Sequence, residues 1–248
     1  PMLNWAVSEL DYLLGTDGQY IQPGGGVSEG PHYFSFALSP ALAMLLAIDN
    51  VIAPDHTFAR DCINRSRVDP WNGYTCIDGD DFHFANPLHH PYFQASIDWD
   101  ISLRMPTGMR PPIADAPIVS LNGGAFLSSI AKRGYYRWDW ENNDISVLNT
   151  TTGFDLSAYH LVYVDDAIEA NEPPWKTQFL PESGNTIFRS GWQTSDRWLL
   201  LMGENGSARK TLHDHVDGLS FVLAAYGELL LTDTGYYKPN SLNNAVTA

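Results

Sequence analysis

The residues best suited to chemistry lie late in the chain, where two histidines stand close to two carboxylates. His213 and His215 are followed by Asp217, and Asp233 comes after two apolar runs that a Tyr-Gly-Glu turn separates. Imidazole and carboxylate groups are the usual zinc ligands and the usual proton carriers of active sites. In an extended strand alternate residues share one face, so His213, His215 and Asp217 would point the same way. A His-x-His pair is also common in polar surface sequence.

The turn at Gly227 bears on whether these groups can meet. A hairpin that reverses there places Asp233 opposite about residue 221, and His215 then lies roughly 20 Å further along the strand. For His215 and Asp233 to bind one ion, the chain has to bend back near Gly218, where a glycine permits a bulge. We therefore expect the histidines on a loop or bend ahead of the strand, with Asp217 as the structural partner that holds the bend.

A second group of polar residues precedes a long apolar stretch. Glu29, His32 and Tyr33 fall within the segment SEGPHYFSFAL, which follows a run of glycines. Tyrosine and histidine can act as positioned proton carriers, so these residues could belong to an active site. The alternative is ordinary helix-start chemistry, in which an acidic residue and Pro31 favour the first helical turn. The residues by themselves leave both interpretations open.

Other charged residues could bind ligands, although structural roles also explain them. Residues 78–90 combine aspartates and histidines but lack the spacing of a calcium loop, so we interpret them as a solvated loop. The candidate contacts for an anionic group are Arg104, Arg110 and Arg189. Each of them would otherwise be a surface or salt-bridged residue.

The composition excludes some partners and leaves others open. The chain has 248 residues, a formal net charge of −15 and only 14 basic residues, which argues against a nucleic-acid partner. An anionic substrate is still compatible, because a local cluster of His and Arg can outweigh the global field. No apolar run approaches the roughly 20 residues of a membrane span, so we expect none. Cys62 and Cys76 suit one disulfide of an exported protein or two buried thiols equally.

Helical periodicity dominates the first part of the chain and strand patterns dominate the last. Apolar spacing predicts helices over residues 3–14, 33–52, 91–104 and 122–133, with Pro40 as a kink or break. Short β-branched or aromatic runs predict strands over residues 160–164, 177–180, 186–190, 198–202, 220–226 and 228–232. Residues 54–90 are predicted to be a long polar connection. Helices followed by strands indicate a helical domain and then an antiparallel β domain, with a boundary near residue 155.

Three segments together resemble the heparinase II/III-like polysaccharide lyases, a group that includes the oligoalginate lyases. Residues 20–38, with SEGPHYFSFAL, resemble the glycine-rich segment of that family's helical domain. PTGMRPPIAD resembles the family's PDG…P…D loop, and ESGNTIFRSGW followed by LHDHVDGLSFVLAAYGELLLTDTGYY resembles the start of its β domain. The order of the three motifs is more specific than any one of them.

The resemblance implies an incomplete (α/α) toroid over residues 1–155 and an antiparallel, sandwich-like β domain over residues 156–248. It implies cleavage of a uronic-acid-containing acidic polysaccharide or oligosaccharide, such as alginate or a glycosaminoglycan, by β-elimination. Tyr33 matches the catalytic tyrosine and His213 the histidine that faces the cleft. His215 and Asp233 match metal ligands, with zinc the expected ion. The candidate substrate-binding residues are Glu29, His32, Arg110 and Arg189.

The chain also departs from the family pattern. Asp214 replaces the glycine between the histidines, and neither an Asn-His pair before Tyr33 nor a third metal-ligand histidine is found. We therefore expect a piece of a longer protein, or a protein that has lost the activity. The alternatives are a metal-dependent hydrolase that uses the His-x-His pair and a non-catalytic carbohydrate-binding protein. A secreted or periplasmic location follows from the resemblance, and homo-oligomer formation is left open.

Overall fold

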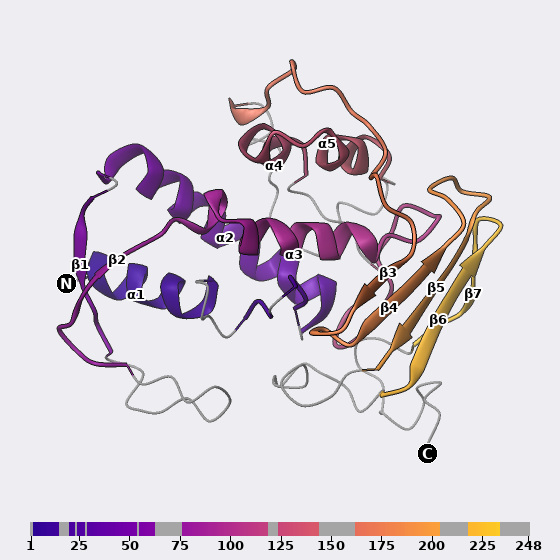
Figure 1. Ribbon diagram of the computed structural model, residues 1–248, viewed down its shortest axis with the longest axis horizontal. Coiled ribbons are helices and arrows are strands. Elements are labelled where there is room, and N and C mark those ends of the chain that lie inside the picture. Colours follow the sequence, from indigo (N-terminus) through magenta and orange to yellow (C-terminus); the bar gives the residue numbers. More distant parts are fainter. Residues whose placement is uncertain are drawn as a thin grey trace.

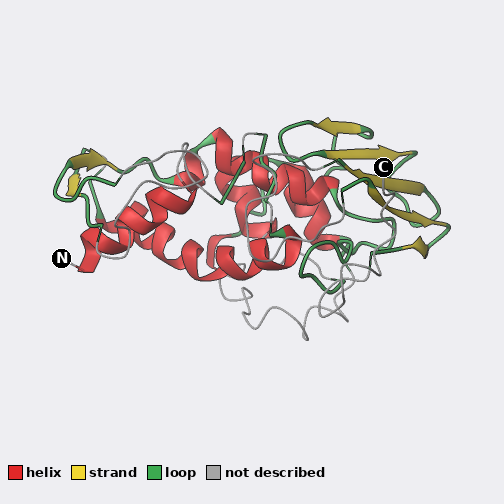
Figure 2. Cartoon of the chain, turned by 90° about the horizontal axis from the view of Figure 1, so that it is seen from below, coloured by secondary structure: helices red, strands yellow, loops and turns green. Residues whose placement is uncertain are grey.

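A computed structural model describes residues 2–14, 20–22, 24–27, 29–53, 55–62, 76–118, 124–143, 162–203 and 218–233. The molecule is elongated, with a layer of helices in the middle, a β-sheet at one end and a small β-hairpin at the other (Figure 1). The view turned by 90° shows the same order along the long axis (Figure 2). The N-terminus lies at the hairpin end (Figure 1).

The described residues form five α-helices, which are α1 (Met2–Leu14), α2 (Gly30–Val51), α3 (Pro91–Ser102), α4 (Gly124–Ala131) and α5 (Gly134–Glu141). Four of them confirm helices expected from apolar spacing, and α5 was not separately predicted. α2 begins ahead of the predicted residue 33, because Pro31 has the backbone angle of a first helical turn. Pro40 does not break α2 but lies exposed in its interior. Closure of these helices into a toroid stays a prediction.

Helix α2 is long and apolar enough to cross a membrane by length and composition alone, with 22 residues and a mean hydropathy of 1.6. This differs from the sequence expectation, which counted its polar residues against a span. Within the protein, 41% of its most apolar window is buried, and Phe34, Leu38 and Leu42 belong to the main core. The core helix of a soluble protein passes the same test, so the hydropathy is weak support for a span.

The sheet has five antiparallel strands in chain order, which are β3 (Gln178–Leu180), β4 (Asn185–Arg189), β5 (Arg197–Met202), β6 (Ser220–Ala225) and β7 (Glu228–Leu231). These confirm five of the six predicted strands. The sixth, over residues 160–164, is wrong where it is described, because Val162 and Tyr163 are helical. The β6–β7 hairpin turns at Tyr226 and Gly227 with φ of 57° and 80°, the left-handed pair that a tight two-residue hairpin requires.

The polar connection expected over residues 54–90 contains a second, small sheet that sequence analysis missed. Strands β1 (Thr57–Ala59) and β2 (Asp81–His83) pair antiparallel, with Phe58 opposite Phe82. A disulfide joins Cys62 to Cys76 beyond the paired residues, which answers the question that the sequence left open. The expected solvated loop is wrong in part, because a 3₁₀ turn over Pro87–His89 buries its apolar residues.

The C-terminal end of α3 holds the helical part against the sheet. The indole N–H of Trp99 donates to Asn185 Oδ1 at 2.9 Å, and that of Trp175 donates to Ser102 Oγ at 3.0 Å. Apolar side chains of α2 and α3 share one core cluster with the inner face of the sheet, including Phe34 and Trp198. Helices α2 and α3 and the sheet therefore share one core.

Candidate active site

Helix α2 begins in a glycine-rich loop that contacts three other parts of the chain. A Cβ on Gly25 would lie 2.1 Å from a backbone carbonyl oxygen of α3, and one on Gly26 would lie 2.1 Å from the Cβ of Ser183 in the β3–β4 turn. Gly30 has a φ of +78°, and its Cβ would lie 2.9 Å from the carbonyl oxygen of Ile113. Only glycine permits these approaches. The first turn of α2 is therefore seated where α3, the loop after α3 and the sheet meet.

Tyr33 and His32 lie on this first turn, and both are half-buried. Their ring centroids are 5.2 Å apart, and the ring of Tyr33 also contacts Phe36 edge-on at 6.2 Å. Glu29 occupies the N-cap position of α2 but makes no side-chain capping bond. The helix-start interpretation is thus right for Pro31, whereas Glu29 provides no side-chain cap.

Tyr20 is a neighbour of this group that sequence analysis missed as a site residue. Burial raises the pKa of its phenol well above the ordinary value, the charge of Glu29 adds to the rise, and Tyr33 contributes further. Tyr20, Glu29 and Tyr33 are therefore close enough to interact electrostatically. The phenol of Tyr20 therefore stays protonated at neutral pH. In that form its hydroxyl can donate a hydrogen bond and accept one. A β-bridge between Ile21 and Val27 brings Tyr20 near α2, and no spacing rule in the sequence signals that contact.

Arg110, a predicted substrate contact, is enclosed inside the helical part. Its Nε donates to Asp100 Oδ2 at 2.8 Å, and its Nη2 donates to Asp139 Oδ2 at 2.8 Å. Arg104 donates to the other oxygen of Asp139 at 2.9 Å. The side chain of Arg110 is 0% exposed, so it offers no surface to a substrate in this structure. Its contacts are those of the alternative role, a salt-bridged residue.

Arg189 on β4 is also buried, at the point where the sheet meets α3. Its Nη2 donates to the carbonyl oxygens of Ser102 at 3.0 Å and Arg104 at 2.6 Å, and its guanidinium stacks on Trp192 with 3.5 Å to the ring centroid. Burial and the nearby positive charges of Arg104 and Arg110 lower its pKa to about 9. A positive charge at the C-terminal end of a helix is favourable, so Arg189 fastens the sheet to α3. Its predicted role in substrate binding stays a prediction.

The histidine pair that opened the sequence argument lies outside the described residues, as does Asp217. Asp233, just beyond β7, is described and is 2% exposed. Ala225 pairs with Glu228 at the turn, but a bulge between Leu223 and Ala224 shifts the register, so that Leu231 pairs with Leu223 and Asp233 lies two residues beyond that pair. Within the described ranges no cluster of three or more His, Cys, Asp or Glu could hold a metal ion. Assembly of His215 and Asp233 therefore stays a prediction.

Comparison with known proteins finds solved structures with a similar fold, but no protein with a similar sequence. No family model and no curated protein matches the sequence. A structure of heparinase III with methylated lysines matches with a TM-score of 0.56 at 15% identity, over 94% of this chain and 28% of that one. A second heparinase III structure matches with a TM-score of 0.55 at 16% identity, over 95% of this chain and 28% of that one. This chain thus has the fold of a little over a quarter of those structures.

Proposed function

We propose that this chain is part of a polysaccharide lyase that cleaves uronic-acid-containing acidic polysaccharide or oligosaccharide by β-elimination. The observation that carries the proposal is the fold shared with heparinase III over 94% of this chain, at a TM-score of 0.56. It is supported by the position of Tyr33, half-buried on the first turn of α2 where the helices meet the sheet. Sites at such junctions are common, because two packed parts form a concave surface between them. Because this chain covers 28% of the heparinase III structure, the activity is proposed for a whole protein of that kind and not for this chain alone.

In the proposed reaction, a base removes the proton at C5 of the uronate and an acid protonates the departing oxygen at C4. A C4–C5 double bond forms as the glycosidic C–O bond breaks, so no co-reactant is consumed. Tyr33 and His213 are the proposed proton carriers, because phenol and imidazole can both give and take protons when positioned. The edge-on contact with His32 and the packing on Phe36 restrict the ring of Tyr33.

Glu29 and His32 are the proposed substrate contacts nearest to Tyr33. Glu29 is not used as a helix cap, and its charge acts on Tyr20. Donors aimed at the uronate carboxylate would stabilise the charge that develops when the C5 proton leaves. Arg189 stays a proposed substrate contact, and the hydrogen bonds of Arg110 and Arg189 also hold α3, α5 and the sheet together.

Zinc is proposed as a site-organising ion held by His215 and Asp233. Asp233 is buried two residues beyond the end of β7, so a metal bound by its carboxylate would lie at that end of the sheet. Imidazole and carboxylate are both normal zinc ligands, and a bound ion would fix the relative positions of β7 and the histidine segment.

The Cys62–Cys76 disulfide supports the further proposal of a secreted or periplasmic location, where disulfides persist.

The test is an assay of the full protein with alginate, heparan sulfate, chondroitin sulfate and hyaluronan, followed by the ultraviolet absorbance of the unsaturated product. We expect absorbance to rise on at least one uronate polymer and to be abolished in Tyr33→Phe, which keeps the ring but removes the hydroxyl. Tyr226→Phe is the matched control, because Tyr226 is 74% exposed in the β6–β7 turn. Binding of a polymer without any product would instead favour a carbohydrate-binding protein.

A further inference from the structure

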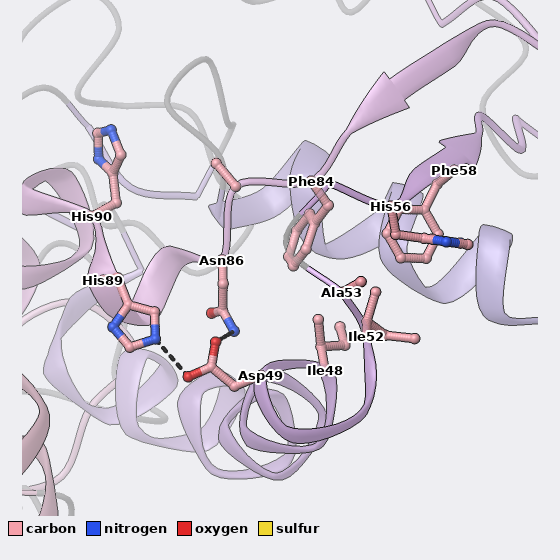
Figure 3. A pocket seen from close by; sticks show the side chains of 11 residues that line it. Ile48, Asp49, Ile52, Ala53, His56, Phe58, Phe84, Asn86, His89 and His90 are labelled. Carbon is pink, nitrogen blue, oxygen red and sulfur yellow. Dashed lines mark hydrogen bonds and ion pairs between the residues drawn. The ribbon is translucent and has the colours of Figure 1, made fainter.

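A pocket of about 530 Å³ lies at the hairpin end of the molecule, between the C-terminal end of α2 and the segment that follows β2 (Figure 3). Its volume is in the range of small-molecule sites. One side is apolar, with Ile48, Ile52 and the ring of Phe84. The other side is polar, with Asp49 and Asn86 among its residues.

The polar side is an ordered hydrogen-bonded group. The Nε2 of His89 lies 2.5 Å from Asp49 Oδ2, and Asn86 Nδ2 donates to Asp49 Oδ1 at 2.9 Å and to the Leu45 carbonyl oxygen at 2.9 Å. Asp49 is therefore held from two sides before any ligand arrives. A carboxylate has about four acceptor positions, so both of its oxygens can still accept a bond from a ligand.

The apolar side is supported by a separate small core. Val7, Ile48 and Phe58 are buried together, and Phe84 packs against them. Phe58 contacts Phe84 edge-on at 6.5 Å, and the imidazole of His56 lies 4.6 Å from the ring of Phe58. Figure 3 shows Phe84 between Asn86 on one side and His56 with Phe58 on the other. The aromatic wall thus has a fixed position opposite Asp49.

This pocket is far from the proposed active site. Tyr33 is the fourth residue of α2 and Asp49 is the twentieth, so about 24 Å of helix separates them at 1.5 Å per residue. Figure 1 shows α2 running from the sheet to the hairpin end. A ligand in this pocket would therefore not contact Tyr33, and the two sites can be tested independently.

We propose that this pocket binds a neutral pyranose sugar unit. A pyranose ring has apolar C–H faces that pack on aromatic and aliphatic walls, and hydroxyl groups that bond to carboxylate, amide and imidazole. The pocket presents this combination, because Phe84 lines it together with Asp49, Asn86 and His89. Among the residues that line it there is no lysine or arginine. The lining therefore offers no lysine or arginine to pair with the carboxylate of an anionic sugar, and the carboxylate of Asp49 would repel it.

The proposal is tested by saturation-transfer NMR with the full protein and two matched probes, methyl β-glucopyranoside and methyl β-glucuronide. These differ only in the carboxylate at C6. We expect the neutral glycoside to bind and the glucuronide to bind more weakly. Asp49→Asn should weaken binding about tenfold, the usual effect of losing a hydrogen bond to a charged group.

Matched variants separate a site from a general change in the hairpin. His56→Ala should also weaken binding, whereas Asp55→Asn and His83→Ala, which alter exposed residues outside the pocket, should not. Tyr33→Phe should bind the glycoside normally, so loss of lyase activity and loss of this site are distinguishable. The proposal is overturned if the neutral glycoside gives no signal, if Asp49→Asn and His56→Ala match their controls, or if the glucuronide binds better.

Discussion

Arg110 and Asp139 form a doubly hydrogen-bonded ion pair, with Nη1 to Oδ1 at 3.1 Å and Nη2 to Oδ2 at 2.8 Å and neither side chain exposed. Asp139 lies on α5, and Arg110 lies in the loop after α3. That same loop carries Ile113, which Gly30 approaches at the start of α2. The pair therefore links α5 to the position of Tyr33 through a few packed residues.

Replacement of Arg110 by Met should lower the free energy of unfolding by roughly 3–5 kcal/mol, because it removes the cation bonded to buried Asp100 and one of the two bonded to buried Asp139. Urea unfolding followed by circular dichroism would measure this. The matched control is Lys132→Met, which removes an exposed ion pair with Asp165 and should cost less than about 1 kcal/mol. Equal costs for the two variants would contradict a structural role of Arg110.

The stability of the protein should depend on the protonation of Asp100. Burial raises the pKa of Asp100 to about 6, since Arg110 is shared with Asp139 and does not offset the lost solvation. The folded state therefore holds this proton more tightly than the unfolded chain, whose aspartates titrate near about 3.9. The contribution of Asp100 to stability is fully present below pH about 4 and is lost as pH rises to about 6.

Unfolding free energies of the parent and Asp100→Asn at several pH values would test this. The unfolding free energy of the parent minus that of Asp100→Asn should fall as the pH rises from about 4 to about 6. Asp139 gives the opposite trend: burial works against its ionisation, but Arg110 and Arg104 hold its pKa below the usual value. Its contribution is present above pH about 4 and is lost at lower pH. A difference that rises with pH in the Asp100→Asn comparison would contradict the assignment.

Two glycines with left-handed backbone allow steric contact to be separated from backbone strain. Gly30 and Gly79 have φ of +78° and +83°, but a Cβ meets Ile113 at 2.9 Å only on Gly30 and nothing within 4 Å on Gly79. Gly79→Ala should cost about 1–2 kcal/mol from the backbone alone. Gly30→Ala should lower the free energy of unfolding clearly more than Gly79→Ala does, as measured by thermal unfolding. It should also reduce lyase activity, because the added Cβ displaces the first turn of α2. Similar costs would show that the Ile113 contact relaxes easily.

The disulfide should stabilise the hairpin end of the protein. Cys62 and Cys76 are separated by 14 positions, and closing a loop of that size is worth about 3 kcal/mol in the chain-entropy account. Addition of dithiothreitol should lower the melting temperature of the parent. The double variant Cys62→Ser, Cys76→Ser should melt at the lower temperature with or without reductant. A parent that is insensitive to reduction would show that the bridge adds little.

The proposed zinc site predicts a change in metal content. The purified full protein should contain about one zinc per chain by elemental analysis, and Asp233→Ala should lose most of it. Chelation should lower the melting temperature of the parent and leave that of the variant unchanged. Asp196→Ala is a suitable control, because Asp196 is a partly exposed turn residue of the sheet with bonds to Ser190 and Gln193. Equal zinc in parent and Asp233→Ala would remove Asp233 from the site.

The sequence by itself determined the features that depend on neighbours a few positions apart. Apolar spacing located α1 to α4, and alternating or β-branched runs located all five strands of the main sheet. The turn at Tyr226 and Gly227 was readable because few residues adopt positive φ. The strand predicted over residues 160–164 was wrong where it is described, because a short apolar run alone does not distinguish a strand from a helical turn.

Only the tertiary structure decided which distant residues meet. Asp49 and His89 are 40 positions apart, and Arg110 meets Asp139 across 29 positions, so no local pattern could pair them. The folded structure also shows that Arg110 is buried in an ion pair with Asp100, which its sequence neighbours do not indicate. It likewise brings Tyr20 close enough to Glu29 for the two side chains to interact. The physical reason is that helix and strand signals arise from adjacent side chains, whereas desolvation and long-range contact exist only once the core has formed.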